Sequence, residues 1–83
     1  MKASKKLKKL VSRLDLLKEE IDNELEHIID NREDIFMERT ERWKNGKFGE
    51  TFYEETERID DLKNEIKVQF EFIFNELNEF ENL

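Results

Sequence analysis

Glu24 and His27 are the side chains of this sequence whose types and spacing could bind a metal ion. Three positions apart on a helix, a carboxylate and an imidazole lie on one face, and helical bundles bind paired iron ions with this Glu-x-x-His spacing. The chain has a single histidine, so such a site would need two copies of the chain, with acids such as Glu71 completing the ligands. A histidine in solvent or between subunits is the favoured explanation of the same residues, and we expect no metal or other cofactor.

Positive and negative charges are separated along the chain. Residues 1–14 contain six basic side chains and no acidic one, whereas the rest of the chain has nine basic and 22 acidic side chains. Clustered lysines can bind the phosphates of nucleic acid, but no aromatic residue lies among them to stack on a base, and the acidic remainder would repel a duplex. Nucleic acid is therefore an alternative partner and not the favoured one. The residues of this basic tip are Lys2, Lys5, Lys6, Lys8, Lys9 and Arg13.

The acidic part of the chain suggests a different kind of binding. Four acids of the second half, Glu57, Asp61, Glu65 and Glu71, lie off the apolar line of their segment and are expected to form an exposed acidic surface. Carboxylates spaced along a rod could imitate nucleic acid and occupy the basic groove of another protein. A net charge of −7 also serves solubility alone, so both explanations stay open.

Composition predicts one small domain over residues 1–83 with a thin core. Hydrophobic residues make up 36% of the chain and charged residues 45%, and small scaffolds without disulfides or metals usually gain stability from a partner subunit. The absence of cysteine fits a reducing, cytoplasmic setting, and no apolar run is long enough to span a membrane. There is no catalytic triad pattern or phosphate-binding glycine loop, and a two-helix rod should have no pocket, so we expect no enzymatic activity.

Two amphipathic helices are expected to position these groups. Apolar residues recur at every seventh position in two separate stretches of the chain, which is typical of helices that pack along one stripe. The first helix is predicted over about residues 3–44, with the line Leu7, Leu14, Ile21, Ile28 and Ile35. A second line through Ile29, Phe36 and Trp43 is expected to take over near the turn, because a helix drifts against a strict seven-residue repeat. The second helix is predicted over about residues 51–81, with the line Phe52, Ile59, Ile66, Ile73 and Phe80.

The turn between these helices is expected over residues 45–50, which hold the only two glycines of a chain without proline. Asn45-Gly46 is typical of a helix end, where one residue takes the left-handed conformation. Thr51 with Glu54 predicts a capping box that starts the second helix. The sequence therefore predicts an all-α fold, an antiparallel two-helix hairpin of the coiled-coil type.

The register of this hairpin can also be predicted, because facing residues of antiparallel helices have numbers with a constant sum. Both apolar lines agree when Ile28 faces Ile66 and Phe36 lies near Ile59. Arg32 and Lys63 then fall near the middle of the contact. They either fix the register as buried polar residues or lay their aliphatic stems across the contact with their charges in water.

Six apolar residues lie outside this pairing and predict contacts with a further chain. Three precede the first paired residues, and three lie off the apolar line of the second helix. They are Leu7, Leu10, Val11, Val68, Phe72 and Phe74. In a lone hairpin these side chains would remain in water, so we expect a homo-oligomer, either a dimeric four-helix bundle or a larger assembly.

The stretch Thr40-Glu41-Arg42-Trp43, followed by Gly49-Glu50, Tyr53-Glu54 and Thr56, resembles a segment of small, acidic, uncharacterised helical-hairpin proteins of phages and prophages. The resemblance covers residues 30–62, about two fifths of the chain, and it identifies no catalytic residue. It implies a small viral accessory protein in the cytoplasm of the host. The expected function is that of a non-enzymatic module that binds another protein, as a modulator or inhibitor of host machinery. The alternatives are a self-associating coiled-coil scaffold and a dimeric metal-binding bundle.

Overall fold

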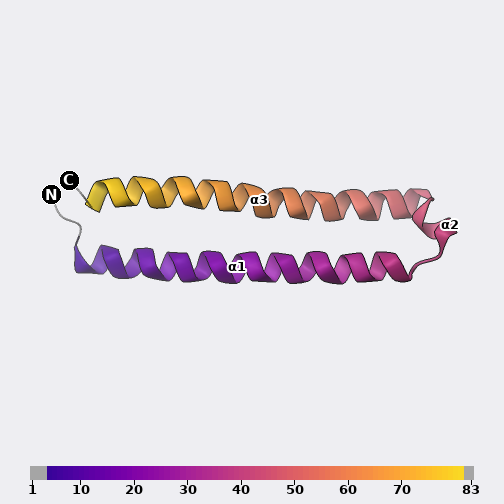
Figure 1. Ribbon diagram of the computed structural model, residues 1–83, viewed down its shortest axis with the longest axis horizontal. Coiled ribbons are helices and arrows are strands. Elements are labelled where there is room, and N and C mark those ends of the chain that lie inside the picture. Colours follow the sequence, from indigo (N-terminus) through magenta and orange to yellow (C-terminus); the bar gives the residue numbers. More distant parts are fainter. Residues whose placement is uncertain (1–3, 82–83) are drawn as a thin grey trace.

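The computed structural model describes residues 4–81, and the regular structure of this part is entirely helical. Its elements are α1 (Lys5–Glu38), α2 (Glu41–Lys44) and α3 (Lys47–Glu81). Figure 1 shows α1 and α3 side by side and antiparallel, with α2 at the corner between them, in an elongated shape of 62 × 16 × 11 Å. The predicted all-α class is confirmed, and the antiparallel arrangement agrees with the expected hairpin.

The first long helix ends earlier than predicted, and a separate short helix follows it. The side-chain oxygen of Ser4 caps the start of α1 by accepting from the backbone N–H of Leu7 at 3.1 Å. Arg39 and Thr40 then have extended backbone conformations. Thr40 Oγ1 accepts from the N–H of Trp43 at 3.2 Å and so caps α2. A continuous helix up to residue 44 is therefore wrong, because a threonine that caps a helix start interrupts it.

The second long helix begins earlier than predicted, at Lys47 instead of residue 51. Thr51 and Glu54 consequently lie inside α3, and the predicted capping box at its start is wrong. No residue within 4–81 has a positive φ, and Asn45 has the right-handed values φ −86° and ψ −5°. The left-handed helix end predicted for Asn45-Gly46 is therefore wrong as well.

Gly49 is needed at the turn for close approach of two backbones. A Cβ atom at this position would lie 2.4 Å from the carbonyl oxygens of both Trp43 and Lys44, far inside the contact distance. Only glycine lets the first turn of α3 lie against the end of α2. Gly49 therefore does mark the turn. It does so because two backbones approach closely there, and not because a residue takes the left-handed conformation.

The pairing of α1 with α3 differs from the predicted register by one to two helical turns. Arg32 Nε donates to Thr56 Oγ1 at 2.9 Å, and the ring of Phe36 stacks on that of Phe52 with centroids 6.4 Å apart. The predicted register placed Ile59 beside Phe36, so it is wrong. The early start of α3 and the insertion of α2 account for the shift.

The contact between the two long helices, here called the seam, is lined by residues that are wholly or partly covered and recur at intervals of three and four. In α1 they are Leu7, Val11, Leu14, Lys18, Asp22, Leu25, Ile29, Arg32 and Phe36, and in α3 they are Phe52, Thr56, Ile59, Lys63, Ile66, Phe70, Phe74 and Leu77. Five residues of the predicted lines lie in the seam, namely Leu7, Leu14, Phe52, Ile59 and Ile66. Ile21, Ile28 and Ile73 lie beside it and are exposed, because a strict seven-residue repeat drifts around a helix with 3.6 residues per turn.

Packing is densest at the turn end. Ile29, 7% exposed, is the only buried hydrophobic residue in the described part of the chain. Close to it, the ring centroid of Phe36 lies 6.0 to 6.4 Å from those of Trp43, Phe52 and Tyr53, and the Trp43 and Phe52 centroids are 5.7 Å apart. This aromatic cluster fixes the relative position of the three helices where they meet.

Candidate protein-binding surfaces

A groove with a volume of about 510 Å³ lies along one side of the helix pair near the turn. We call it the turn groove. Covered apolar and aromatic side chains form its floor, and exposed carboxylates stand at its rim. It is lined by Ile29, Arg32, Glu33, Phe36, Met37, Phe52, Tyr53, Thr56, Glu57 and Asp60. The expectation that a two-helix rod has no pocket is therefore wrong.

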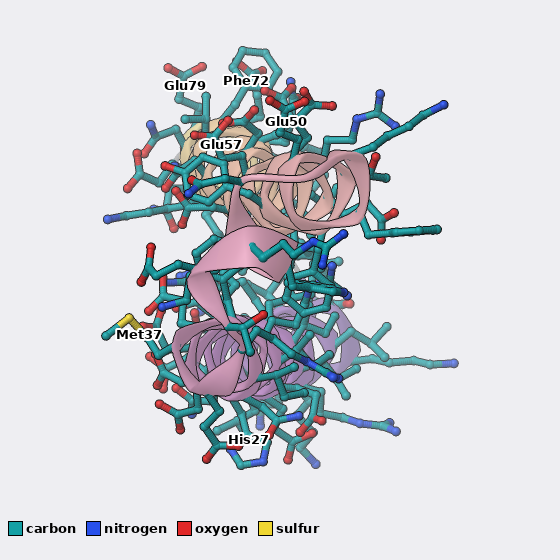
Figure 2. All side chains as sticks on the ribbon, turned by 90° about the vertical axis from the view of Figure 1, so that its right-hand side faces the viewer. His27, Met37, Glu50, Glu57, Phe72 and Glu79 are labelled. Atoms are coloured by element: carbon teal, nitrogen blue, oxygen red, sulfur yellow. The ribbon has the colours of Figure 1, made fainter. Side chains whose placement is uncertain are left out.

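Both long helices supply the rim of the turn groove with the residue that directly follows a seam residue. In α1 these residues are Glu33 and Met37, and in α3 they are Tyr53, Glu57 and Asp60. One residue turns a helix by about 100°, so the following residue points sideways out of the seam. Figure 2, which looks at the turn end, shows Met37 projecting to one side of the helix pair.

Arg32 forms the polar part of the groove floor and ties the two helices together. Its Nη2 donates to the carbonyl oxygen of Phe52 at 3.1 Å and forms an ion pair with Glu55 at 3.3 Å. Its Cζ lies 4.0 Å from the centroid of the Phe52 ring, within range of a cation–π interaction. The guanidinium is therefore held in the contact through several bonds, which supports the register-fixing role of this residue.

The carboxylates at the rim change the ionisation of Tyr53. A hydrogen bond and the negative charge of Glu57 raise the pKa of the phenol above its usual 10.0, and burial and the charge of Glu33 raise it further. Each effect disfavours a second negative charge at this place. The groove rim is thus an acidic environment that favours cations.

The same negative environment continues along the helix pair to Lys63. This seam residue donates a hydrogen bond to Glu26, and that bond is the main reason why the pKa of the lysine lies above 10.5. Burial acts in the opposite direction, and the charges of Glu26, Asp22 and Asp60 raise the pKa again. The side of the helix pair that contains the turn groove is therefore negative beyond the groove itself.

The predicted acidic surface is divided between two faces of α3. Glu57 lies at the rim of the turn groove. Asp61 is exposed and lies opposite the seam, Glu65 is exposed and directly precedes the seam residue Ile66 on the side away from the groove, and Glu71 is exposed farther along the groove side. These four acids therefore do not converge on one binding surface, although Glu57 contributes to the groove.

The six predicted interface residues are also divided. Val68 and Phe72 are exposed and lie on the outer face of α3, where Figure 2 shows Phe72 pointing away from α1. Phe74 is partly covered in the seam, with its ring centroid 5.9 Å from that of Phe70.

At the other end of the chain, Leu7 and Val11 are likewise partly covered, whereas Leu10 is exposed. The expectation that Leu7, Val11 and Phe74 lie outside the contact between the helices is wrong, because the shifted register extends the seam to them.

The remaining candidate residues are exposed. Lys5, Lys6, Lys8, Lys9 and Arg13 occupy the first turns of α1, and Lys2 lies outside the described residues. Glu24 and His27 are in solvent, and in Figure 2 His27 points away from α3. Within residues 4–81, no three histidine, aspartate or glutamate side chains are placed to hold a metal ion.

Met37, Phe48 and Tyr53 are surface residues that the sequence pattern did not identify. Met37 and Tyr53 line the turn groove. Phe48, 78% exposed, lines a second hollow of about 440 Å³ with Trp43, Lys47, Thr51, Phe52 and Glu55. Large apolar residues off the predicted lines are the pattern that could have indicated all three.

Neither long helix within residues 4–81 combines the length and the apolarity needed to cross a bilayer. No known protein family, characterised protein sequence or solved structure matches this chain.

Proposed function

We propose that the protein is a non-enzymatic binding module whose turn groove takes a basic, partly apolar segment of another protein. The observation that carries this proposal is the lining of the groove. Ile29, Phe36 and Phe52 offer an apolar floor, while Glu33, Glu57 and Asp60 offer carboxylates around it. A helical segment with an apolar anchor and flanking lysines or arginines matches both parts.

The negative charge around the turn groove supports a basic partner over an acidic one. The rim carboxylates raise the pKa of Tyr53, and the neighbouring acids raise that of Lys63. The outer face of α3 adds further exposed acids. A basic surface that normally binds nucleic acid has the complementary charge, so imitation of nucleic acid is one form that this binding could take.

The resemblance of residues 30–62 to phage and prophage proteins gives the proposal a biological setting. A phage-encoded module of this type would modulate or inhibit a basic protein of the host in its cytoplasm. The residues that line the turn groove lie almost entirely within this stretch, so the resemblance and the groove concern the same part of the chain.

Self-association of the helix pair, into a dimer of four long helices or a larger assembly, is part of the proposal. A single buried hydrophobic residue in the described part of the chain leaves little core to stabilise a monomer. A scaffold that binds only further copies of itself is the second candidate function, and this thin core favours it.

A synthetic amphipathic helix of lysines and leucines tests the groove. Fluorescence anisotropy of the labelled peptide should show binding that weakens with added salt. The triple variant Glu33→Gln, Glu57→Gln, Asp60→Asn should weaken it about tenfold, since each exposed charge pair contributes roughly 0.5 kcal/mol. Met37→Ala should weaken it further through the apolar part of the contact.

A matched charge change on the outer face of α3 controls for simple attraction between opposite charges. The variant Glu54→Gln, Asp61→Asn, Glu79→Gln removes the same number of carboxylates outside the groove and should leave the affinity nearly unchanged. Equal losses in the two triple variants, or a larger loss with Phe72→Ala than with Met37→Ala, would refute the turn groove as the binding site.

A further inference from the structure

One side of the helix pair carries large apolar side chains from both long helices. Six of them directly precede a seam residue, and they are Leu10, Leu17, Ile21, Ile28, Leu62 and Ile73. Residues that follow seam residues in α1 and α3 meet at the turn groove. The preceding residues of both helices therefore meet on the opposite side, about 100° from the seam in the other direction.

Two phenylalanines extend this surface toward its ends. Phe80 lies seven positions, two helical turns, after Ile73 and so shares its face. Phe48 lines the second hollow together with Thr51 and Glu55, which directly precede seam residues. The eight residues, here called the apolar side, are each between 37% and 78% exposed.

The total exposed surface of the chain is large for its mass. A compact monomer of 10.2 kDa exposes about 5,300 Å², whereas this chain exposes 7077 Å². The excess is about a quarter of the whole surface. A second copy that covers one side of the helix pair would bury much of this excess surface.

The area of the apolar side matches what a stable homodimer needs. The eight residues are on average about half exposed, which corresponds to about 600 Å² at roughly 150 Å² per fully exposed side chain, the lower end of the range for large apolar side chains. A homodimer interface buries about 800 Å² per partner, of which about 65%, or roughly 500 Å², is apolar. The apolar side alone supplies this amount.

Charge permits a second copy of this chain as the occupant. The acids Glu26, Glu33, Glu57 and Asp60 lie on the opposite side of the helix pair, so they point outward when two apolar sides face each other. The apolar side also has charged residues of both signs that directly precede seam residues, namely Lys6, Arg13, Glu24, Glu55, Arg58, Glu65 and Glu76. Acids of one copy can therefore lie near basic residues of the other, and exposed charges of this kind contribute little to stability either way.

We infer that the apolar side is the interface through which two copies of the chain pack face to face, with the turn grooves open on the outside. The inference rests on the self-association proposed above and assigns it to particular residues. It differs from the interface expected from sequence, since Val68 and Phe72 remain in solvent. Binding of a basic segment at the turn groove does not depend on it.

Sedimentation equilibrium of the full chain at micromolar concentration tests the inference. The wild type should sediment as a dimer, and the variant Leu17→Glu, Leu62→Glu should weaken dimerisation by roughly a hundredfold because it would place carboxylates in the interface. Leu16→Glu is the matched control, since Leu16 is 65% exposed and lies on the outer face of α1. It should dimerise like the wild type.

Hydroxyl-radical footprinting of the wild-type chain locates the dimer interface without any substitution. Phe48 and Phe72 are both strongly exposed in the single chain. With rising protein concentration, oxidation of Phe48 should fall while that of Phe72 stays constant.

A wild type that is monomeric at these concentrations would overturn the self-association and this inference together. A dimer in which Phe72 is protected instead of Phe48, or which Leu16→Glu dissociates as strongly as the double variant, would overturn the apolar side alone.

Discussion

Replacement of Arg32 by methionine tests whether a polar seam residue fixes the pairing of α1 with α3. Methionine keeps an unbranched apolar stem of similar reach and removes the guanidinium. The change deletes the bonds to Thr56 Oγ1 at 2.9 Å and to the Phe52 carbonyl at 3.1 Å, the ion pair with Glu55, and the contact with the Phe52 ring. The folded chain should therefore become less stable, and α1 and α3 should be less restricted to one pairing.

The expected loss follows from these contacts. Each hydrogen bond from a charged donor contributes about 1.5–3 kcal/mol, and the cation–π contact about 0.5–1 kcal/mol. The ion pair adds less, because the Glu55 side chain is 54% exposed. Removing the charge also relieves its desolvation, since the Arg32 side chain is only 20% exposed. We expect Arg32→Met to lower the free energy of unfolding by about 2–3 kcal/mol.

Urea denaturation followed by circular dichroism measures this change, at one fixed protein concentration because association adds to stability. Arg42→Met is the matched control, since Arg42 is exposed on α2, outside the seam, the turn groove and the apolar side, and its replacement should change stability by less than about 0.5 kcal/mol. A double-mutant cycle with Thr56→Val should show coupling to Arg32. Equal losses for Arg32→Met and Arg42→Met would refute a register-fixing role.

Three further predictions concern the turn and the groove rim. Gly49→Ala should lower thermal stability by about 1–3 kcal/mol, because its Cβ would lie 2.4 Å from two carbonyl oxygens; an unchanged melting temperature would contradict the close approach. Thr40→Ala should cost about 1 kcal/mol as a lost cap, whereas Thr51→Ala inside α3 should cost clearly less in the same urea titration. Ultraviolet titration should show Tyr53 ionising above pH 10.0, and Glu57→Gln should lower that pKa. Since the folded state keeps a proton that the unfolded state releases, stability should fall as pH rises above about 10.

Periodicity in the sequence was sufficient for the helical class and for the existence of two long helices, but not for their register. Each helix has two apolar lines side by side, such as Ile28 beside Ile29 and Ile73 beside Phe74. A pattern of hydrophobic residues cannot decide which line faces the neighbouring helix and which forms an exposed side. The seam also contains Arg32, whose role depends on partners that only the folded chain brings together.

The sequence could predict some residues of the turn groove but not the groove itself. The sequence contains the carboxylates, and Glu57 was expected at an acidic surface. Their convergence with Met37 and Tyr53 depends on the register and on the early end of α1, which the cap at Thr40 decides. A threonine followed by an acid in the first turn of α2 is a local pattern that could have indicated this break.

The concentration of aromatic packing at the turn end implies an order in which the chain folds. Contacts there join residues close in sequence, such as Arg32 and Phe52, 20 positions apart, whereas Glu26 and Lys63 farther along the pair are 37 positions apart. Closing the shorter loop costs less chain entropy, so folding should nucleate at the turn and proceed toward the open ends. The same gradient should appear in amide hydrogen exchange, slowest around Ile29 and fastest at the start of α1.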